Sequence, residues 1–244
     1  MRVPRFYLPV PLTVGAHASL EGGAFNHAVR VLRLKPGAPL ILFDGEGGAY
    51  TATLGEISGR EASVEVMEAL PAPVEPALPI VLAQGISRGE KMDHTVQKAV
   101  ELGVSIFQPL FTERGGVRLN DERLTRKVQH WRGIVIGACE QCGRNRLPEL
   151  REPLTLATWL AMPMAPGSRL LLDPLAEHSL RSLDPPSEAL TLLIGPEGGL
   201  SPEELAQART AGFVGVRLGP RVLRTETAGM AALAAVQALW GDWD

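Results

Sequence analysis

Two glycine- and proline-rich turns near the C-terminus carry the residues best suited to binding a ligand. The first turn, Ile194–Glu204, reads IGPEGGLSPEE, and the second, Leu218–Thr227, reads LGPRVLRTET. Each turn follows an apolar strand and precedes a helix. Glycines allow the backbone to approach a ligand closely and to present its own N–H and C=O groups. Turns of this kind at the carboxyl ends of strands form the ligand crevice of α/β folds.

The first turn does not have the sequence of a phosphate-binding loop. A Walker loop needs a Lys followed by Ser or Thr after its glycines, and neither follows here. The glycine spacing also differs from that of a dinucleotide fingerprint. Glu197 and the pair Glu203-Glu204 add negative charge, which disfavours an anionic ligand further.

Sequence signals at both turns predict the helices that follow. Ser201 and Glu204 form a capping box with a proline at the first helical position, so we expect a helix to begin at Ser201. Thr225 or Thr227 is suited to cap the last helix, about Ala228–Trp240. That helix is rich in Ala and Gly, which fits either tight core packing or a close subunit contact.

The chain upstream of these turns must supply the sheet that positions them. Strand signals alternate with helix signals, a pattern typical of a mostly parallel sheet covered by helices on both faces. We therefore expect an α/β fold for this part of the chain. The predicted strands are Ile80–Gln84, Ile106–Phe111, Arg169–Leu172, Thr191–Ile194 and Val214–Leu218, and the predicted helices between them include Lys91–Leu102 and Asp121–Cys139.

The first seventy residues have a different pattern of predicted secondary structure, with several short strands and one helix. Apolar residues from Phe25 to Leu32 recur at helical spacing and predict a helix over Gly23–Leu34. Val64 and Val66 alternate with charged residues, as in a half-buried strand. The strands predicted here are an edge strand within Arg5–Leu12, followed by Pro39–Phe43, Ala49–Ile57 and Glu61–Leu70.

A proline-rich segment, residues 71–76, lies between the strand-rich N-terminal part and the part in which strands and helices alternate. It has the composition of a stiff linker. We therefore predict two domains. Residues 1–72 form a small β-barrel-like domain, and residues 73–244 form the α/β domain.

The composition is that of a globular protein. Hydrophobic residues make up 45% of the 244 residues, which is enough for a full core. Apolar runs fall short of the roughly 20 residues that span a bilayer, and the N-terminus lacks signal-peptide features, so we expect a cytoplasmic protein without a membrane partner. Cys139 and Cys142 lie near the end of a predicted helix without further ligands spaced for zinc, so we interpret them as structural and expect no metal.

Basic residues are concentrated in two segments although the net charge is −3. Residues 1–35 hold five Lys or Arg against one acid, and residues 88–146 hold eleven against seven. Two basic segments on an otherwise acidic chain indicate either a localised positive face that binds nucleic acid or an ordinary solvated surface.

Both C-terminal turns resemble the signature of the SPOUT superfamily of methyltransferases. Within it, the match is to the family that methylates N3 of a uridine in small-subunit (16S) ribosomal RNA, the RsmE family. The resemblance extends to three earlier segments, in the order of the family, and so covers nearly the whole chain. They read HAVRVLRLKPGAPLILFDGEGGAYTA, KMDHTVQKAVELGVSIFQPLFTERG and ACEQCGRNRLPEL.

The resemblance implies a PUA-like RNA-binding domain followed by a methyltransferase domain with a C-terminal trefoil knot that forms a homodimer. It implies S-adenosyl-L-methionine as cofactor, with S-adenosyl-L-homocysteine as product, in a cleft lined by the knot loops. The cofactor-binding residues expected on this basis are Leu172, Asp173, Ile194, Gly195, Pro196, Glu197, Gly198, Gly199, Leu218, Gly219, Val222, Leu223, Thr225, Thr227 and Ala228.

The implied chemistry gives two residues candidate catalytic roles. Loss of the N3 proton leaves negative charge on the uracil carbonyl oxygens, and the permanently charged guanidinium of Arg224 is suited to holding it, unless Arg224 is paired with Glu226 or Glu197 instead. Glu197 would be a general base if burial raised its pKa; otherwise it is structural or orients a neighbour.

The partner implied is small-subunit ribosomal RNA or the assembled subunit. Asn145, flanked by Arg144 and Arg146, is a candidate for contacting the base or the RNA backbone. The residues expected to bind RNA are Arg5, His27, Arg30, Arg33, Arg114, Arg144, Asn145 and Arg146. The alternatives are a SPOUT methyltransferase that acts on another rRNA or tRNA position, and a non-enzymatic RNA-binding assembly factor.

Overall fold

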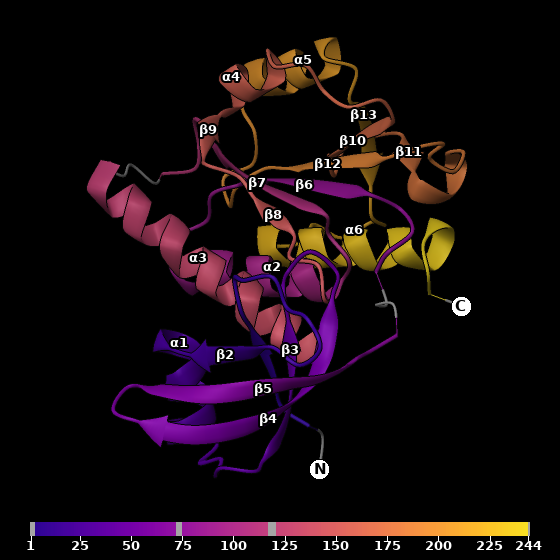
Figure 1. The fold of residues 1–244 in the computed structure, drawn as a ribbon. Helices are drawn as coiled ribbons and strands as arrows, with labels where there is room; N and C mark the ends of the chain where they lie inside the picture. The colour runs from indigo at the N-terminus through magenta and orange to yellow at the C-terminus, as the bar shows by residue number, and fades with distance from the viewer. Residues whose placement is uncertain (1–2, 72–74, 117–120, 244) are drawn as a thin grey trace. The chain divides into compact units, whose positions relative to one another are not determined.

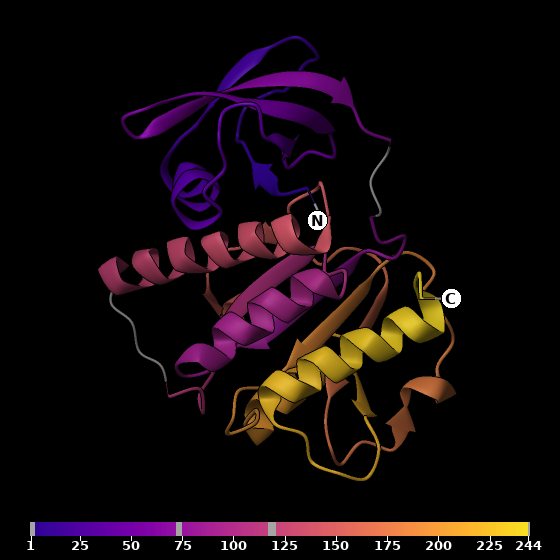
Figure 2. The same cartoon turned by 90° about the horizontal axis from the view of Figure 1, so that it is seen from below.

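The structure is a computed structural model that describes residues 3–71, 75–116 and 121–243, so residues 72–74 of the predicted linker lie outside the described residues. The chain divides into two compact units (Figures 1 and 2). Unit 1 comprises Met1–Glu75 and Ile136–Leu147, and unit 2 comprises Pro76–Val135 and Pro148–Asp244. No local sequence signal had indicated that residues from the middle of the chain pack with the N-terminal unit.

Unit 1 is built on a five-stranded sheet with the order β1-β3-β4-β5-β2. β1 pairs with β3 in parallel, and the other pairs are antiparallel. The three central strands were predicted, and β1 lies at an edge as expected, whereas β2 was not predicted. The strands are β1 Arg5–Tyr7, β2 His17–Leu20, β3 Pro39–Phe43, β4 Ala49–Ser58 and β5 Glu61–Ala69.

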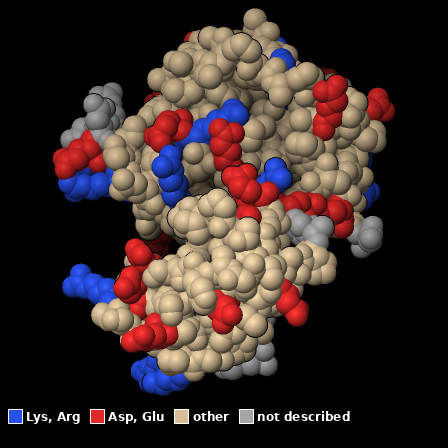
Figure 3. Space-filling model, viewed as in Figure 1, with Lys and Arg blue, Asp and Glu red and all other residues tan. Residues whose placement is uncertain are grey.

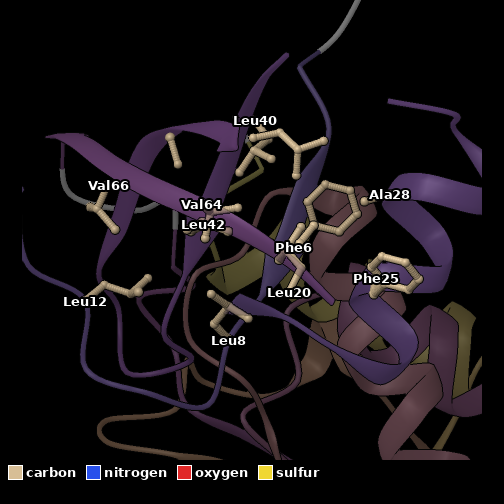
Figure 4. Close-up of a cluster of buried hydrophobic side chains, with 13 residues drawn as sticks. Phe6, Leu8, Leu12, Leu20, Phe25, Ala28, Leu40, Leu42, Val64 and Val66 are labelled. Atoms are coloured by element: carbon tan, nitrogen blue, oxygen red, sulfur yellow. The ribbon is translucent and has the colours of Figure 1, made fainter. Parts of the chain in front are cut away.

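One hydrophobic cluster fills unit 1 (Figure 4). In β5 the buried residues alternate with exposed ones, so that Val64 and Val66 point into the cluster while Glu65 points to solvent. Phe6 from β1 and Leu42 from β3 pack in the same cluster. The period-two pattern read from the sequence therefore reflects a sheet with one buried face.

The predicted helix Gly23–Leu34 was wrong in its form. The chain makes α1, Gly22–Phe25, and then a π-helical segment η1, Asn26–Val31. The N–H of Leu32 donates to the carbonyl of His27, five residues back, at 2.9 Å. A π-helix has more residues per turn than an α-helix, so Leu32 is exposed rather than returned to the inner face.

Unit 2 contains an eight-stranded sheet in which every pairing is parallel, as predicted. Seven strands follow the order β11-β13-β10-β12-β6-β7-β8, and β9 also pairs with β7. The strands are β6 Ile80–Gly85, β7 Ile106–Phe111, β8 Glu149–Leu150, β9 Leu154–Thr155, β10 Ser168–Leu172, β11 His178–Ser179, β12 Leu190–Ile194 and β13 Val214–Arg217. The two-residue strands carry no pattern that could have predicted them.

Helices cover both faces of this sheet (Figure 1). The helices α4 and α5 contact each other on one face, and α2 and α6 contact each other on the opposite face. Figure 2 shows α2 between α6 and α3. The helices are α2 Glu90–Glu101, α3 Asp121–Cys142, α4 Leu156–Leu160, α5 Pro202–Thr210 and α6 Thr225–Trp240, with a short 3-10 helix η2, Leu180–Ser182.

Both cysteines lie in the last turn of α3 as free thiols. Burial raises the pKa of Cys139 to about 12, which keeps this thiol protonated and unreactive. No three His, Cys, Asp or Glu side chains within the described ranges are grouped so that they could hold a metal ion. The helices in those ranges include none that is long and apolar enough to cross a membrane.

Candidate functional site

A pocket of about 570 Å³ lies in unit 2, where the loops after β10, β12 and β13 meet the start of α6. These three strands are neighbours or next neighbours in a parallel sheet, so their carboxyl ends lie at one edge. The pocket is lined by Lys91, Leu172–Leu175, Ile194–Leu200, Leu205, Val216–Gly219, Arg221–Thr225 and Ala228.

The pocket contains all the residues expected to bind a cofactor except Thr227, which is exposed and does not line it. Some additional lining residues directly flank the expected ones in sequence, namely Pro174, Leu200, Arg217 and Arg221. Leu175, Leu205 and Val216 line the pocket as well. Lys91, from α2, had no signal in the sequence, because only the tertiary fold brings that helix to the first turn.

Close backbone packing shapes the first turn. A Cβ atom built on Gly85 would lie 2.6 Å from the nitrogen of Pro196, and one built on Gly198 would lie 2.9 Å from Arg114 Cβ. Such separations exclude any side chain, so these glycines permit the turn to rest on the ends of β6 and β7.

The predicted capping box is confirmed at the start of α5. Ser201 accepts a hydrogen bond from the N–H of Glu204 at 3.2 Å, and Glu204 accepts one from the N–H of Ser201 at 2.9 Å. The second carboxylate oxygen of Glu204 accepts from the N–H of Glu113 at 2.9 Å. Glu204 is buried by these contacts and, like Glu203, does not line the pocket.

The acidic flank of the first turn therefore contributes less negative charge to the pocket than the sequence suggested. The two acids that line it are both paired, Asp173 with Arg209 at 3.1 Å and Glu197 with Lys91 at 3.4 Å. Arg217, Arg221 and Arg224 line it as well. The lining as a whole carries more positive than negative side chains.

The expected capping role of Thr225 and Thr227 was wrong. Arg224 occupies the N-cap position, with an extended backbone, and makes no side-chain capping bond. Thr225 is the first residue of α6, and its hydroxyl donates to the carbonyl of Gly195 at 2.6 Å. The contact with the first turn takes this hydroxyl away from the helix end.

Arg224 is exposed and its guanidinium makes no hydrogen bond or ion pair with the described part of the chain. The alternative pairing with Glu226 or Glu197 is not formed, because Glu197 accepts from Lys91 and from the N–H of Arg88 instead. A permanently charged group thus lies unpaired among the lining residues of the pocket.

Glu197 does not meet the condition set for a general base. Partial burial alone would raise the pKa of its carboxyl group, but hydrogen bonds from its own N–H, from the N–H of Arg88 and from Lys91 lower the pKa overall. A carboxylate that binds its proton more weakly than usual is a weaker base. Its contacts instead attach the first turn to the start of α2.

Four residues expected to contact RNA take part in one hydrogen-bond network of unit 1. Glu75 accepts from the side chain of Arg144 and from the backbone N–H groups of Asn145 and Arg146, at 2.8–3.0 Å. Arg5 donates to the amide oxygen of Asn145 at 2.6 Å. Asn145 is 4% exposed and Arg144 is 7% exposed, so these two side chains are not accessible to RNA in this structure, and their contact with RNA stays a prediction.

The other expected RNA contacts are accessible. His27 lies 3.7 Å from Glu140, and Arg30 lies over the ring of Phe25, yet both are exposed. The remaining exposed members of the set are Arg33, Arg114 and Arg146. On the face shown in Figure 3, basic and acidic side chains are interspersed on each unit and do not form one continuous basic patch.

Sequence comparisons define the class of this protein. Residues 74–237 match the family described as "RNA methyltransferase domain", and residues 20–67 match the "RNA methyltransferase PUA domain". The fold and these matches together define an RNA methyltransferase with an N-terminal PUA-like domain.

Individual relatives narrow the class further. A ribosomal RNA small subunit methyltransferase E from Buchnera aphidicola is 34% identical, with 99% of this chain and 98% of the relative covered. The crystal structure of the enzyme of the same name from Neisseria gonorrhoeae, bound to S-adenosyl methionine, is 42% identical and superposes with a TM-score of 0.95 over the whole of both chains. A putative methyltransferase from Legionella pneumophila, in complex with SAM, is 40% identical with the same TM-score and the same full coverage of both chains. This chain belongs to the ribosomal RNA small subunit methyltransferase E family.

The close contact between Gly85 and Pro196 leads to a testable prediction about the stability of the protein. Gly85→Ala introduces a methyl group only 2.6 Å from the backbone nitrogen of Pro196, so we expect the free energy of unfolding to fall by about 1–3 kcal/mol. Gly133→Ala, in the exposed middle of α3 with open space around the new methyl group, should raise it by about 0.5–1 kcal/mol. Urea denaturation measures both, and equal stabilities of the two variants would contradict the packing argument.

Proposed function

We propose that this protein transfers a methyl group from S-adenosylmethionine to N3 of a uridine in small-subunit ribosomal RNA. One observation supports this most directly: an apolar pocket lined by backbone groups includes a cation, Arg224, that has no partner within the described chain. The substrate class comes from the names of the relatives, which are ribosomal RNA small subunit methyltransferases.

The pocket residues fit the proposed cofactor. Adenosine is neutral and largely apolar, and a sulfonium carries positive charge, so both suit aliphatic side chains and backbone dipoles better than a phosphate cradle. Leu172, Ile194, Leu218 and Leu223 supply aliphatic surface, and the glycines of the first turn expose backbone groups. S-adenosylmethionine supplies the methyl group, which passes to the acceptor nitrogen by direct displacement.

Arg224 is proposed to hold the uracil ring as its N3 proton leaves. The negative charge that develops is delocalised onto the carbonyl oxygens beside N3, and a planar guanidinium can donate two hydrogen bonds to such an anion. Because Arg224 has no other partner among the described residues, this interaction does not require an existing ion pair to be broken. Glu197 is assigned to loop positioning and not to proton transfer, since its pKa is lowered.

Exposed basic residues are proposed to bind the RNA backbone. His27, Arg30 and Arg33 on unit 1 and Arg114 beside the pocket loops of unit 2 can contact phosphate groups. The target uridine must be unpaired or extruded from a helix, because its N3 is otherwise engaged in base pairing.

The domain roles follow from the same proposal. Residues 1–72 serve as the RNA-binding domain and residues 73–244 as the methyltransferase domain. The trefoil knot and the homodimer stay predictions from the family resemblance, with the small residues along α6 offering a surface for close subunit contact. A cytoplasmic location is part of the proposal, and a ribosomal RNA substrate supports it.

Nucleoside mapping of ribosomal RNA by mass spectrometry tests the proposed function. Cells that lack this protein should lose 3-methyluridine at one position of small-subunit RNA and regain it when the gene is restored. Loss of a modification elsewhere in rRNA or in tRNA would support another substrate. Unchanged RNA together with no calorimetric heat on addition of S-adenosylhomocysteine would support a non-enzymatic factor.

Arg224→Ala tests the proposed catalytic charge. The side chain is exposed and makes no hydrogen bond or ion pair with the described residues, so the thermal midpoint should stay within about 2 °C. We expect the single-turnover rate to fall by about 100- to 1,000-fold, as on removal of one preorganised anion-stabilising donor, with cofactor affinity nearly unchanged. A single-turnover rate close to that of the wild type would remove Arg224 from the mechanism.

The double change Arg30→Glu with Arg33→Glu tests the RNA surface of unit 1. Both side chains are exposed, so we expect weaker RNA binding, a shallower salt dependence and unaltered affinity for S-adenosylhomocysteine. The matched control is Arg60→Glu, an exposed arginine in the turn between β4 and β5. Equal RNA affinities of the double variant and this control across a salt series would show that η1 does not contact RNA.

A further inference from the structure

We propose that Gln84 is a positioning residue that holds the two pocket turns together and thereby orients Arg224 for catalysis. Gln84 lies on β6, is 0% exposed and does not line the pocket. The inference rests on the proposed methyltransferase function and adds to it a residue that acts through others.

The side-chain amide of Gln84 contacts both turns at once. One N–H of its Nε2 donates to Thr225 Oγ1 at 2.9 Å, and the other is shared between the carbonyl of Gly85 at 3.1 Å and that of Gly195 at 3.4 Å. The hydroxyl of Thr225 also donates to the carbonyl of Gly195, at 2.6 Å. Three groups from β6, the first turn and the start of α6 thus form one closed set of hydrogen bonds, which we name the Gln84 network.

This network fixes the backbone at Gly195, in the first turn, and at Thr225, next to the proposed catalytic residue Arg224. Gly195 is the second residue of the first turn. Its carbonyl oxygen accepts the hydroxyl of Thr225 at 2.6 Å and the longer contact from Gln84 at 3.4 Å, which together hold the peptide between Gly195 and Pro196 in one orientation. Thr225 directly follows Arg224, so the hydrogen bonds of Thr225 fix the position of the Arg224 backbone and thereby orient its side chain. Catalysis depends on such alignment, since small displacements of a catalytic group reduce rates strongly.

The buried amide of Gln84 lowers the stability of the fold, which indicates that this side chain has a role beyond packing. Gln84 Oε1 is buried and has no hydrogen-bond partner in the described part of the chain. A buried unsatisfied oxygen reduces stability, and an aliphatic residue of similar size would avoid that loss. Departures of this kind from the most stable choice are found at functional sites.

Gln108 provides a matched control one strand away. It lies on β7, is 1% exposed, and its Nε2 donates to two backbone carbonyls, those of Pro109 at 2.9 Å and Glu152 at 3.0 Å. Neither Gln108 nor these partners line the pocket. Replacing each glutamine with methionine therefore removes a buried amide of similar setting, once inside the Gln84 network and once outside it.

The test compares Gln84→Met with Gln108→Met in the full-length protein. At saturating cofactor and RNA we expect kcat of Gln84→Met to fall by about 10- to 100-fold, while Gln108→Met stays within about twofold of the wild type. We expect the dissociation constant of S-adenosylhomocysteine to rise by less than about tenfold in Gln84→Met, so that turnover is affected more than binding.

Thr225 tests whether the groups act as one unit. Thr225→Val removes the hydroxyl at nearly constant volume, and we expect the double variant with Gln84→Met to be scarcely slower than either single variant. Thr225→Ser, which restores the hydroxyl, should recover most of the rate lost in Thr225→Val.

Each outcome decides a different claim. Equal kcat values for the two methionine variants, or losses that multiply in the double variant, would overturn the positioning role of Gln84. Wild-type protein that binds S-adenosylhomocysteine but methylates no ribosomal RNA would overturn the proposed function and, with it, the assignment of Gln84 to that reaction.

Discussion

The site depends on one backbone contact, the placement of the first pocket turn directly against the end of β6. Gly85 has no side chain, and the nitrogen of Pro196 lies only 2.6 Å from where a Cβ atom would be. This contact brings Gly195 within reach of Gln84, and Gln84 in turn reaches Thr225 at the start of α6. The hydrogen bonds that join the two pocket turns therefore depend on this close approach of two backbones.

The acidic side chains that line the pocket are paired, whereas the guanidinium of Arg224 is available to bind an anion. The acids among its lining residues are engaged, Asp173 by Arg209 and Glu197 by Lys91 and a backbone N–H. Arg224 has no such partner within the described chain. A site of this kind can stabilise an anion that develops during reaction without first giving up a resident counterion, which is the condition for electrostatic preorganisation.

Local sequence signals predicted the parts of the fold that local physics decides. The capping box at Ser201 and the alternating pattern of β5 both appear in the structure, since each depends on residues only two or three positions apart. The helix near Phe25 shows the limit of such rules, because its π-helical hydrogen bonds change the residues per turn and leave Leu32 exposed. Helical spacing in the sequence does not distinguish these two helix forms.

The sequence by itself determined the two pocket turns, the parallel α/β order and the family resemblance, because glycine, proline and strand patterns are written in neighbouring residues. Only the tertiary structure decided which polar side chains are exposed and which are buried in hydrogen bonds within the protein. Asn145 and Arg144 were expected to meet RNA but are buried against Arg5 and Glu75, and Gln84, which carries no local signal, joins both turns. Hydrogen bonds between residues seventy or more positions apart follow from chain topology, which composition and spacing do not encode.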